Sequence, residues 1–197
     1  MLSDREILDA LSEKRLGIVP FSEENLRPNS YLLTLGDEVG FLEPRSAIVS
    51  ILDKSTFPYI RKRPIGESGY LLSPRQFVLC GTVEKLALTS EYGGIVQNRS
   101  GLARLGLSIE ISSLISSGYG SSTPAPLTLE LYNFSEQPIR LFAGVPVCHV
   151  VFHRLGVPSS MSYDRDIGRH SLDKAPEGSR FVPSARRHAL NSKLNRL

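Results

Sequence analysis

Short apolar or alternating runs separated by turn residues occupy the chain from about residue 40 to residue 155. We predict strands at residues 47–52, 70–72, 77–82, 94–98, 108–111, 127–132, 139–142 and 145–152. An earlier alternating segment, residues 31–35, predicts one more strand that ends at Gly36-Asp37. Many short strands with frequent turns are typical of an all-β sandwich or barrel.

Two segments depart from this rhythm and predict helix. Ser3 followed by Glu6 is a capping-box pattern, and an apolar stripe follows it at helical spacing: Ile7, Leu8 and Leu11. This helix is expected to stop near Gly17. Residues 99–105, between two predicted strands, look like a single helical turn.

The composition changes after Phe152. The chain has 197 residues, of which 41% are hydrophobic and 22% charged, enough for one domain with a buried core. Residues 156–179 are rich in Gly, Pro, Ser and charge, and the end is basic. We therefore expect a β domain over residues 1–155 and a C-terminal extension over residues 156–197. A solvated tail is favoured over an anion-binding one.

Charge and cysteine content exclude several classes of protein. The 23 basic and 20 acidic residues leave a net charge of +3, too close to balance to indicate nucleic acid as the main partner. The two cysteines, Cys80 and Cys148, are too few for a disulfide framework and favour a reducing, cytoplasmic compartment. No apolar run approaches the roughly 20 residues that span a membrane, and the first residues form no signal peptide.

Several kinds of catalytic site are also excluded. The chain has neither the G-x-x-x-x-G-K-S/T phosphate loop nor G-x-G-x-x-G after a strand. Zinc nucleobase deaminases need H-x-E with P-C-x-x-C, and this chain has no C-x-x-C. His149 and His153 are four residues apart, a metal-binding spacing on a helix, but their segment is strand-like. Zinc chemistry is therefore not supported.

Arg99, Ser100 and Arg104 form the densest polar group in the middle of the chain. A glycine-flanked helical turn there could present backbone N–H groups and two guanidinium groups to a phosphate or carboxylate. The alternative is a surface turn with ordinary salt bridges, which the spacing alone slightly favours.

Glu130 stands in the middle of a predicted strand. Alternation over residues 127–132 places Thr128, Glu130 and Tyr132 on one face and three leucines on the other. A carboxylate is disfavoured in a strand, which favours the hypothesis that Glu130 has a functional role. If it faces a pocket, partial burial raises its pKa and suits it to general-base work. A solvated polar face explains the periodicity at least as well.

Together these segments resemble the dCTP deaminase family. Residues 98–107 are similar to its G-R-S-S-L-A-R-x-G-L motif and residues 129–133 to L-E-x-x-N. Residues 2–7, 28–31 and 72–88 look like that family's opening and central strands. The resemblance extends from residue 2 to about residue 155, and weakly to residue 180.

The resemblance implies a mainly β fold, a distorted β-barrel or jelly-roll of the trimeric dUTPase-like type, with a short N-terminal helix and a few helical turns. It implies a homotrimer with sites between subunits. The implied activity is zinc-independent hydrolytic deamination of dCTP to dUTP and ammonia, with Mg²⁺ carried by the triphosphate rather than bound by the protein. The implied ligands are nucleotides, namely dCTP and also dUTP or dTTP.

The resemblance also implies roles for individual residues. Glu130 would be the general base, while Ser100 and Arg104 would hold the water and stabilise the tetrahedral intermediate. Arg99 and the backbone N–H groups from Ser100 to Ala103 would bind the triphosphate. The implied substrate-binding residues are Arg99, Ser100, Gly101, Leu102, Ala103, Arg104, Ser116, Thr128, Leu129, Glu130, Tyr163 and Arg169.

Four positions depart from the family pattern. Ser116 replaces an aspartate that contacts the sugar, Gly101 replaces a serine, and Asp173 stands where a glutamine closes the family's C-terminal motif. Residues 120–126 form a longer connection than usual. These departures keep open a nucleotide-binding homologue that is inactive on dCTP or acts on a modified pyrimidine nucleotide. A dUTP diphosphatase, alone or after deamination, is the other alternative, and the missing aspartate weakens it, because the resemblance implies that this aspartate is also central in trimeric dUTPases.

Overall fold

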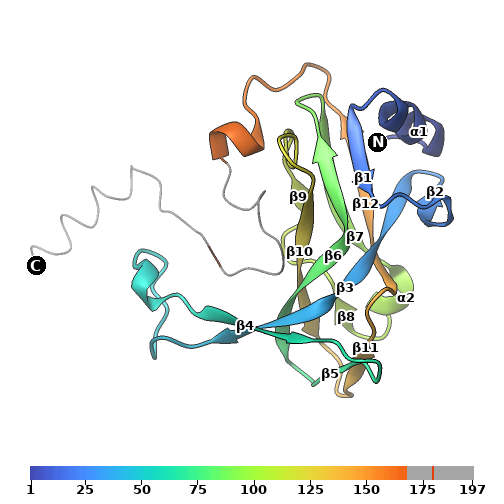
Figure 1. The fold of residues 1–197 in the computed structure, drawn as a ribbon. Coiled ribbons are helices and arrows are strands. Elements are labelled where there is room, and N and C mark those ends of the chain that lie inside the picture. The colour runs from blue at the N-terminus through green and yellow to red at the C-terminus, as the bar shows by residue number, and fades with distance from the viewer. Residues whose placement is uncertain (168–178, 180–197) are drawn as a thin grey trace, which may run out of the picture.

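Most of the chain folds into one strongly curled, ten-stranded sheet, with a separate two-stranded sheet at its lower end (Figure 1). The computed structural model describes residues 1–167 and residue 179. The expectations for Arg169 and Asp173 lie outside these described residues.

The helical elements are α1 (Asp4–Ser12), α2 (Ser100–Ala103), two short 3-10 turns, η1 (Glu23–Asn25) and η2 (Lys54–Thr56), and one turn of π-helix, η3 (Tyr163–Ile167). The strands are β1 (Leu16–Val19), β2 (Leu26–Arg27), β3 (Ser30–Glu43), β4 (Tyr59–Pro64), β5 (Tyr70–Leu72), β6 (Phe77–Leu88), β7 (Tyr92–Asn98), β8 (Leu107–Ser108), β9 (Leu114–Ile115), β10 (Ala125–Asn133), β11 (Ile139–Leu141) and β12 (Pro146–Arg154).

The large sheet runs in the order β8-β10-β6-β3-β12-β7-β9. Strand β6 lies inside it and pairs antiparallel with β10, with β3 and, at its far end, with β1. The sheet curls around a core built from the alternate apolar residues of these strands, among them Leu33, Val78, Leu131 and Phe152. Such burial on one face explains why their alternation was readable from the sequence.

Helix α1 has the predicted capping box. The Ser3 hydroxyl accepts a hydrogen bond from the Glu6 N–H at 3.3 Å, and the Glu6 carboxylate accepts one from the Ser3 N–H at 2.8 Å. Ile7 is buried against the core, whereas Leu8 is 40% exposed. The helix ends at Ser12, earlier than the Gly17 boundary that we expected.

The strand predictions were correct wherever alternation was backed by burial. The predicted strands at residues 70–72, 77–82, 94–98, 127–132, 139–142 and 145–152 correspond to β5, β6, β7, β10, β11 and β12. The predicted helical turn is α2. For residues 108–111 the prediction was mostly wrong, because β8 ends at Ser108.

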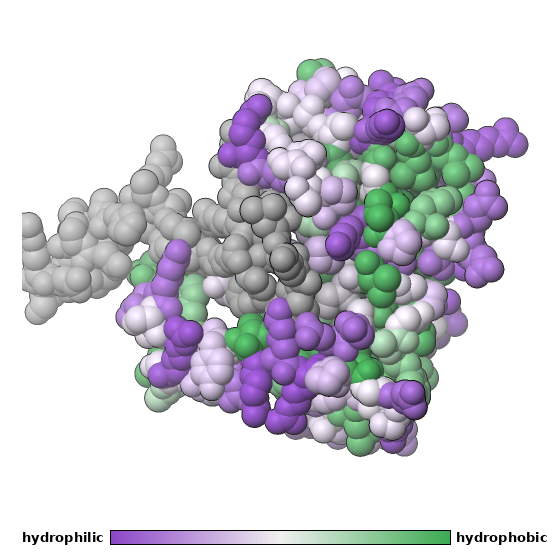
Figure 2. Space-filling model, viewed as in Figure 1, coloured by the Kyte–Doolittle hydropathy of each residue, from purple (hydrophilic) through white to green (hydrophobic). Residues whose placement is uncertain are grey.

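The prediction of a strand at residues 47–52 was wrong. This segment forms bends and a turn in the connection between β3 and β4, which extends away from the barrel as an arm (Figure 1). It has no strand beside it to pair with, and Ile48 is 77% exposed. Figure 2 shows hydrophobic residues at the surface among hydrophilic ones in this part of the molecule.

Strand β3 does not end at Gly36-Asp37 as predicted but continues to Glu43. Its register with β6 shifts between Leu35 and Val39, which marks a bulge. A Cβ atom at Gly36 would lie 2.9 Å from the Gly81 carbonyl oxygen on β6. Gly36 therefore permits two backbones to approach closely within the sheet, and is not a turn residue here.

Both cysteines are buried free thiols. No helix among the described residues is long and apolar enough to cross a membrane.

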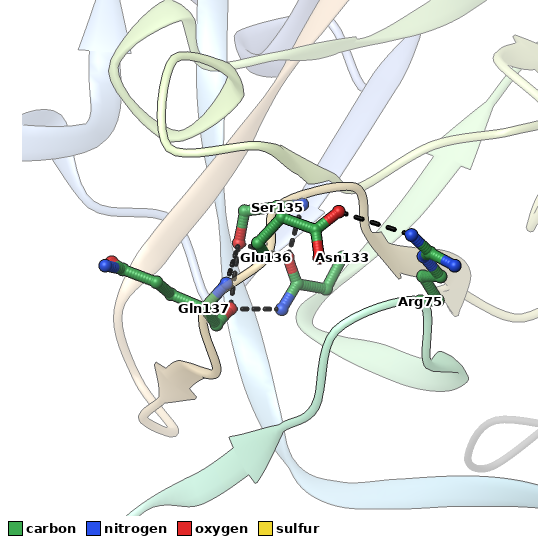
Figure 3. Close-up of polar contacts among 5 residues, drawn as sticks. All are labelled: Arg75, Asn133, Ser135, Glu136 and Gln137. Atoms are coloured by element: carbon green, nitrogen blue, oxygen red, sulfur yellow. Dashed lines mark hydrogen bonds and ion pairs between the residues drawn. The ribbon is translucent and has the colours of Figure 1, made fainter.

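The turn after β10 is organised by the fully buried side chain of Asn133 (Figure 3). Its amide nitrogen donates to the Leu72 carbonyl at 3.1 Å and to the Gln137 carbonyl at 2.8 Å. Its amide oxygen accepts from the N–H and the hydroxyl of Ser135, at 2.9 and 2.8 Å. Next to this turn, the Phe134 N–H donates to the Gly106 carbonyl at 2.7 Å, which connects it to the segment after α2.

Asn133→Ala is expected to lower the free energy of unfolding by about 2 kcal/mol or more, because buried backbone groups lose their partners. Chemical denaturation would measure it. The matched control is Gln137→Ala, since Gln137 takes part through its backbone carbonyl and its side chain is exposed. Equal losses in both variants would contradict this role for Asn133.

Candidate functional site

The carboxylate of Glu130 is held by the loop between β8 and β9. Its Oε2 atom accepts hydrogen bonds from the backbone N–H of Ile111 at 3.2 Å and of Ser112 at 3.0 Å. Within β10, Thr128, Glu130 and Tyr132 are half-buried while the residues between them are buried. The two faces predicted for this strand are therefore confirmed, and its polar face is not simply solvated.

Glu130 lines a cavity of about 490 Å³. Much of its wall is apolar, and Thr128, Ser112 and a second carboxyl group, Glu110, add polar groups. The apolar and aromatic lining residues are Leu42, Phe77, Leu79, Val96, Leu114, Ile115, Tyr119, Leu127, Leu129 and Tyr163. A concave, mostly apolar pocket with a few polar groups has the character of a small-molecule site.

Glu110 was not singled out in the sequence, although it lies in the alternating run at residues 108–111, because alternation alone does not show that its polar face meets a cavity. Its pKa is raised, mainly by burial and additionally by the nearby charge of Glu130, while a hydrogen bond from the backbone of Asn98 acts in the opposite direction. Its Oε2 atom is buried without a hydrogen-bond partner among the described residues. Two carboxyl groups with different environments thus share one cavity.

A second cavity, of about 310 Å³, lies at the start of α2. Its wall includes Arg99, Ser100, Gly101 and Leu102 together with His149 from β12. The Arg99 guanidinium donates to the Pro146 carbonyl at 2.6 Å, which orients it across the cavity wall. A guanidinium group with a hydroxyl and an imidazole beside it can bind an oxyanion.

The backbone of α2 is only partly available to a ligand. The N–H groups of Leu102 and Ala103 donate to the Arg99 carbonyl at 3.0 and 2.9 Å. Of the backbone donors expected between Ser100 and Ala103, these two already have partners inside the turn. The N–H groups of Ser100 and Gly101 are the ones better suited to a phosphate.

His149 is a site residue that the sequence did not reveal in this role. Its Nδ1 lies 3.0 Å from the Ser30 hydroxyl. Its pKa is lowered from the ordinary 6.5, first by burial and then by the positive charges of Arg99 and Arg27. The His149 imidazole is therefore mainly neutral at neutral pH, and the positive charge of this cavity comes from Arg99. The sequence pattern showed that β12 has a polar face, but periodicity does not show that this face meets the start of α2.

The sequence-predicted residues fall into two groups in one chain. Thr128, Leu129, Glu130 and Tyr163 line the first cavity, and Arg99, Ser100, Gly101 and Leu102 line the second. Ala103 and Arg104 are exposed and line neither. Ser116 is half-buried and lines neither, although its neighbour Ile115 lines the first. Glu130 and Ser100 are thus not brought to one cavity within a single chain.

A bound metal ion requires several ligating side chains close together. Among the described residues no three His, Cys, Asp or Glu side chains are grouped to hold a metal ion. Burial raises the pKa values of Cys80 and Cys148 to about 12, so both are neutral thiols at physiological pH.

Comparison with solved structures defines the class of fold first. The chain is similar to the 2'-deoxycytidine 5'-triphosphate deaminase of Agrobacterium tumefaciens, with a TM-score of 0.58, 20% sequence identity and coverage of 78% of this chain. It spans 47% of that protein's length, about half. The mainly β fold class expected from the sequence is confirmed.

Sequence comparison then gives the family. The family model described as dCTP deaminase-like matches residues 1–155. A protein named "dCTP deaminase, dUMP-forming" from Hydrogenobaculum sp. (strain Y04AAS1) is 33% identical over 160 residues, covering 81% of this chain and 85% of its own length. One of the same name from Aquifex aeolicus (strain VF5) is 30% identical over 187 residues, covering 92% and 94%. The chain belongs to the dCTP deaminase-like family, as its motifs indicated.

Arg99→Gln is expected to raise the pKa of His149, because it removes a nearby positive charge that disfavours the imidazolium. Added inorganic triphosphate is expected to raise it too, since an anion stabilises the charged form. Triphosphate affinity should therefore increase as the pH falls through the imidazole titration. NMR titration of the imidazole protons measures both effects. Arg154→Gln, at the exposed end of β12, is the control and should leave the pKa of His149 unchanged. An unchanged His149 pKa in Arg99→Gln would contradict the electrostatic effect of Arg99.

Proposed function

We propose that this protein catalyses the hydrolytic deamination of dCTP to dUTP and ammonia, without zinc and with Glu130 as the general base. The observation that carries the proposal is the position of Glu130: a carboxylate in the middle of a strand, oriented by two backbone N–H groups, in the wall of a largely apolar cavity. Membership of the dCTP deaminase-like family supports the same reaction.

The hydrogen-bonding of Glu130 suits a base. Both backbone donors bind Oε2, and no described residue donates to Oε1. Oε1 is therefore the atom suited to take a proton from water. The two N–H groups hold the carboxylate in one orientation, which reduces the reorganisation needed during the reaction.

The reaction follows from this placement. Glu130 takes a proton from water while the water oxygen attacks C4 of the cytosine, which gives a tetrahedral intermediate. Protons are then delivered toward the amino nitrogen, the C4–N bond breaks, and ammonia leaves. Ser100 and Arg104 would hold the water and stabilise the intermediate. Main-chain groups of Thr128 and Leu129 would recognise the base edge, which discriminates more strongly than an apolar pocket.

We infer that the triphosphate binds in the second cavity. Arg99, the N–H groups of Ser100 and Gly101, and His149 offer positive charge and donors to its oxygens. Mg²⁺ would arrive with the nucleotide as part of the substrate, which requires no ligand from the protein. Tyr163, in the wall of the first cavity, and Arg169 are further candidates for contacts to the nucleotide.

We further infer that the complete site forms between copies of the chain in a homotrimer. Glu130 lines one cavity, whereas Ser100 lines another, and Arg104 is exposed beside it. A neighbouring copy that presents its residues 99–104 to the Glu130 cavity would unite the two groups. Two described residues of the C-terminal extension (residues 156–197), Tyr163 and Ser179, line the Glu130 cavity, which supports a role for the extension in closing over the nucleotide.

A second candidate function is release of pyrophosphate after deamination. Relatives of this chain carry the name "dCTP deaminase, dUMP-forming", which favours it. The serine at position 116 argues against it, because the resemblance to trimeric dUTPases implies that an aspartate at this position is central to diphosphatase activity. Ammonia and pyrophosphate measured side by side, on dCTP and on dUTP, separate the two functions. Neither product, with nucleotide still raising the unfolding temperature, would indicate a binding protein.

Glu130→Gln is expected to reduce ammonia release from dCTP by at least about a hundredfold, because the base is lost, while dCTP affinity stays within about tenfold. A coupled ammonia assay and calorimetric binding measure the two. Glu136→Gln, at a side chain that is 82% exposed, is the matched control and should behave as wild type. Substantial remaining activity in Glu130→Gln would remove Glu130 as the base.

If each active site forms between two copies of the chain, two inactive variants should complement each other in mixed trimers. Glu130→Gln and Arg104→Gln should each be nearly inactive alone. Co-expressed in equal amounts, they should recover up to about a quarter of wild-type activity, since each site draws one residue from each of two copies. Separate expression followed by mixing of assay samples is the control. If co-expression restores nothing, both residues serve a site within one chain.

A further inference from the structure

Four side-chain atoms in the described part of the chain are buried without a hydrogen-bond partner. Three of them, Arg15 Nε, Thr89 Oγ1 and Glu91 Oε2, belong to neighbouring residues, since Arg15 approaches Glu91 to 3.7 Å and its carbonyl accepts from the Thr89 N–H. That cluster is structural and lines none of the cavities described above. The fourth, Glu110 Oε2, lines the cavity of Glu130. A buried polar atom without a partner in a ligand cavity suggests that its partner is the ligand.

The fold couples Glu110 to Glu130 through one short loop. The two residues that follow Glu110, Ile111 and Ser112, are the ones whose N–H groups hold the Glu130 carboxylate. On the other side, the Ile109 N–H donates to the Asn98 side chain at 2.7 Å. The backbone of the segment carrying Glu110 is therefore fixed on both sides, which keeps Glu110 in the wall of the cavity that Glu130 also lines.

Among the described residues of a single chain, no positive charge acts on Glu110. From β10 it faces the carboxylate of Glu130, and from β7 it receives a hydrogen bond from the Asn98 backbone. From β12 the Cys148 thiol lies close enough to be influenced by Glu110, and that thiol is neutral. Tyr163 lines the same cavity. Two carboxyl groups that share one partly buried cavity do not both ionise easily.

We propose that Glu110 is a second carboxyl group of the active site, which holds a proton while Glu130 is ionised and delivers it to ring nitrogen N3 of the substrate. This assignment rests on the deamination proposed above and divides its acid and base roles between two residues. Glu130 is the base because backbone N–H groups stabilise its charge, and Glu110 is the acid because its environment disfavours charge.

The proton balance of this scheme closes over one turnover. Glu130 takes one proton from water as the oxygen bonds to C4, the C4=N3 electron pair moves to N3, and Glu110 gives N3 its proton. In the second stage Glu130 gives its proton to the amino nitrogen and the C4–N bond breaks. The hydroxyl proton returns to Glu110 as the carbonyl forms. Ammonia and the uracil product leave, and both carboxyl groups regain their starting states.

Glu110→Gln tests the role in catalysis, because glutamine keeps the shape and the hydrogen bond but has no proton to transfer. We expect kcat for ammonia release to fall by at least about a hundredfold while dCTP affinity changes by less than about threefold. Wild-type kcat should decline at high pH as Glu110 loses its proton, and this decline should be absent from the residual activity of Glu110→Gln. Glu110→Asp should regain part of the activity.

Two results would overturn the assignment. One is a Glu110→Gln variant that keeps more than about half of the wild-type kcat with an unchanged pH profile. The other is a variant that loses dCTP affinity and kcat together while its thermal unfolding stays normal, which would make Glu110 a binding group only. Glu136→Gln again serves as the exposed control.

A titration without substrate separates this proposal from the proposed function. Carbon NMR of carboxyl-labelled glutamate should show one signal, absent in Glu110→Gln, with a pKa above the ordinary value. In Glu130→Gln the pKa of that signal should fall, because the neighbouring charge is gone. An ordinary Glu110 pKa in both proteins would overturn the pairing. If wild type releases no ammonia from dCTP, both the proposed function and the proton-transfer role of Glu110 are wrong. The titration then still tests whether the charge of Glu130 raises the pKa of Glu110.

Discussion

The two hydrogen bonds from Ile111 and Ser112 to the Glu130 carboxylate are the contact on which the candidate site depends. Residues 109–113 belong to no strand, so their backbone needs acceptors from elsewhere, and Glu130 supplies two of them. The contact fixes the orientation of a carboxylate that strand propensity disfavours, and it keeps Glu110 beside the same cavity. The same two hydrogen bonds thus give the N–H groups of this loop their acceptors and hold the candidate catalytic carboxylate in place.

Charge is divided between two cavities. The first holds two carboxyl groups within a mainly apolar wall, and the second gathers Arg99 and His149, with Arg27 close enough to influence the imidazole. A nucleoside triphosphate has the same division, with an uncharged base at one end and an anionic chain at the other. The overall net charge of +3 concealed this pattern, because opposite charges separated within the molecule cancel in the sum.

Much of the fold was predictable where local pattern and burial agree. The alternation in residues 127–132 belongs to β10, which pairs with β6 on both sides of a register shift between Pro126 and Thr128, and the turn at residues 99–105 contains α2. The apolar run at residues 47–52 has the same local character as a strand but lacks a partner to pair with. Gly36 resembles a turn residue in the sequence, yet its lack of a side chain serves the close approach to Gly81.

The amino-acid sequence by itself determined the β class, the capped first helix, the polar face that carries Glu130 and the motifs of the dCTP deaminase-like family, because each depends on residues close together in the chain. Only the tertiary structure decided that Glu110 joins Glu130, that His149 joins Arg99, and that these two groups line separate cavities. The physical reason is that strand pairing brings together residues tens of positions apart, as it does Arg99 and Pro146. Periodicity shows which face of a strand is polar, but the packing of the whole chain determines what that face meets.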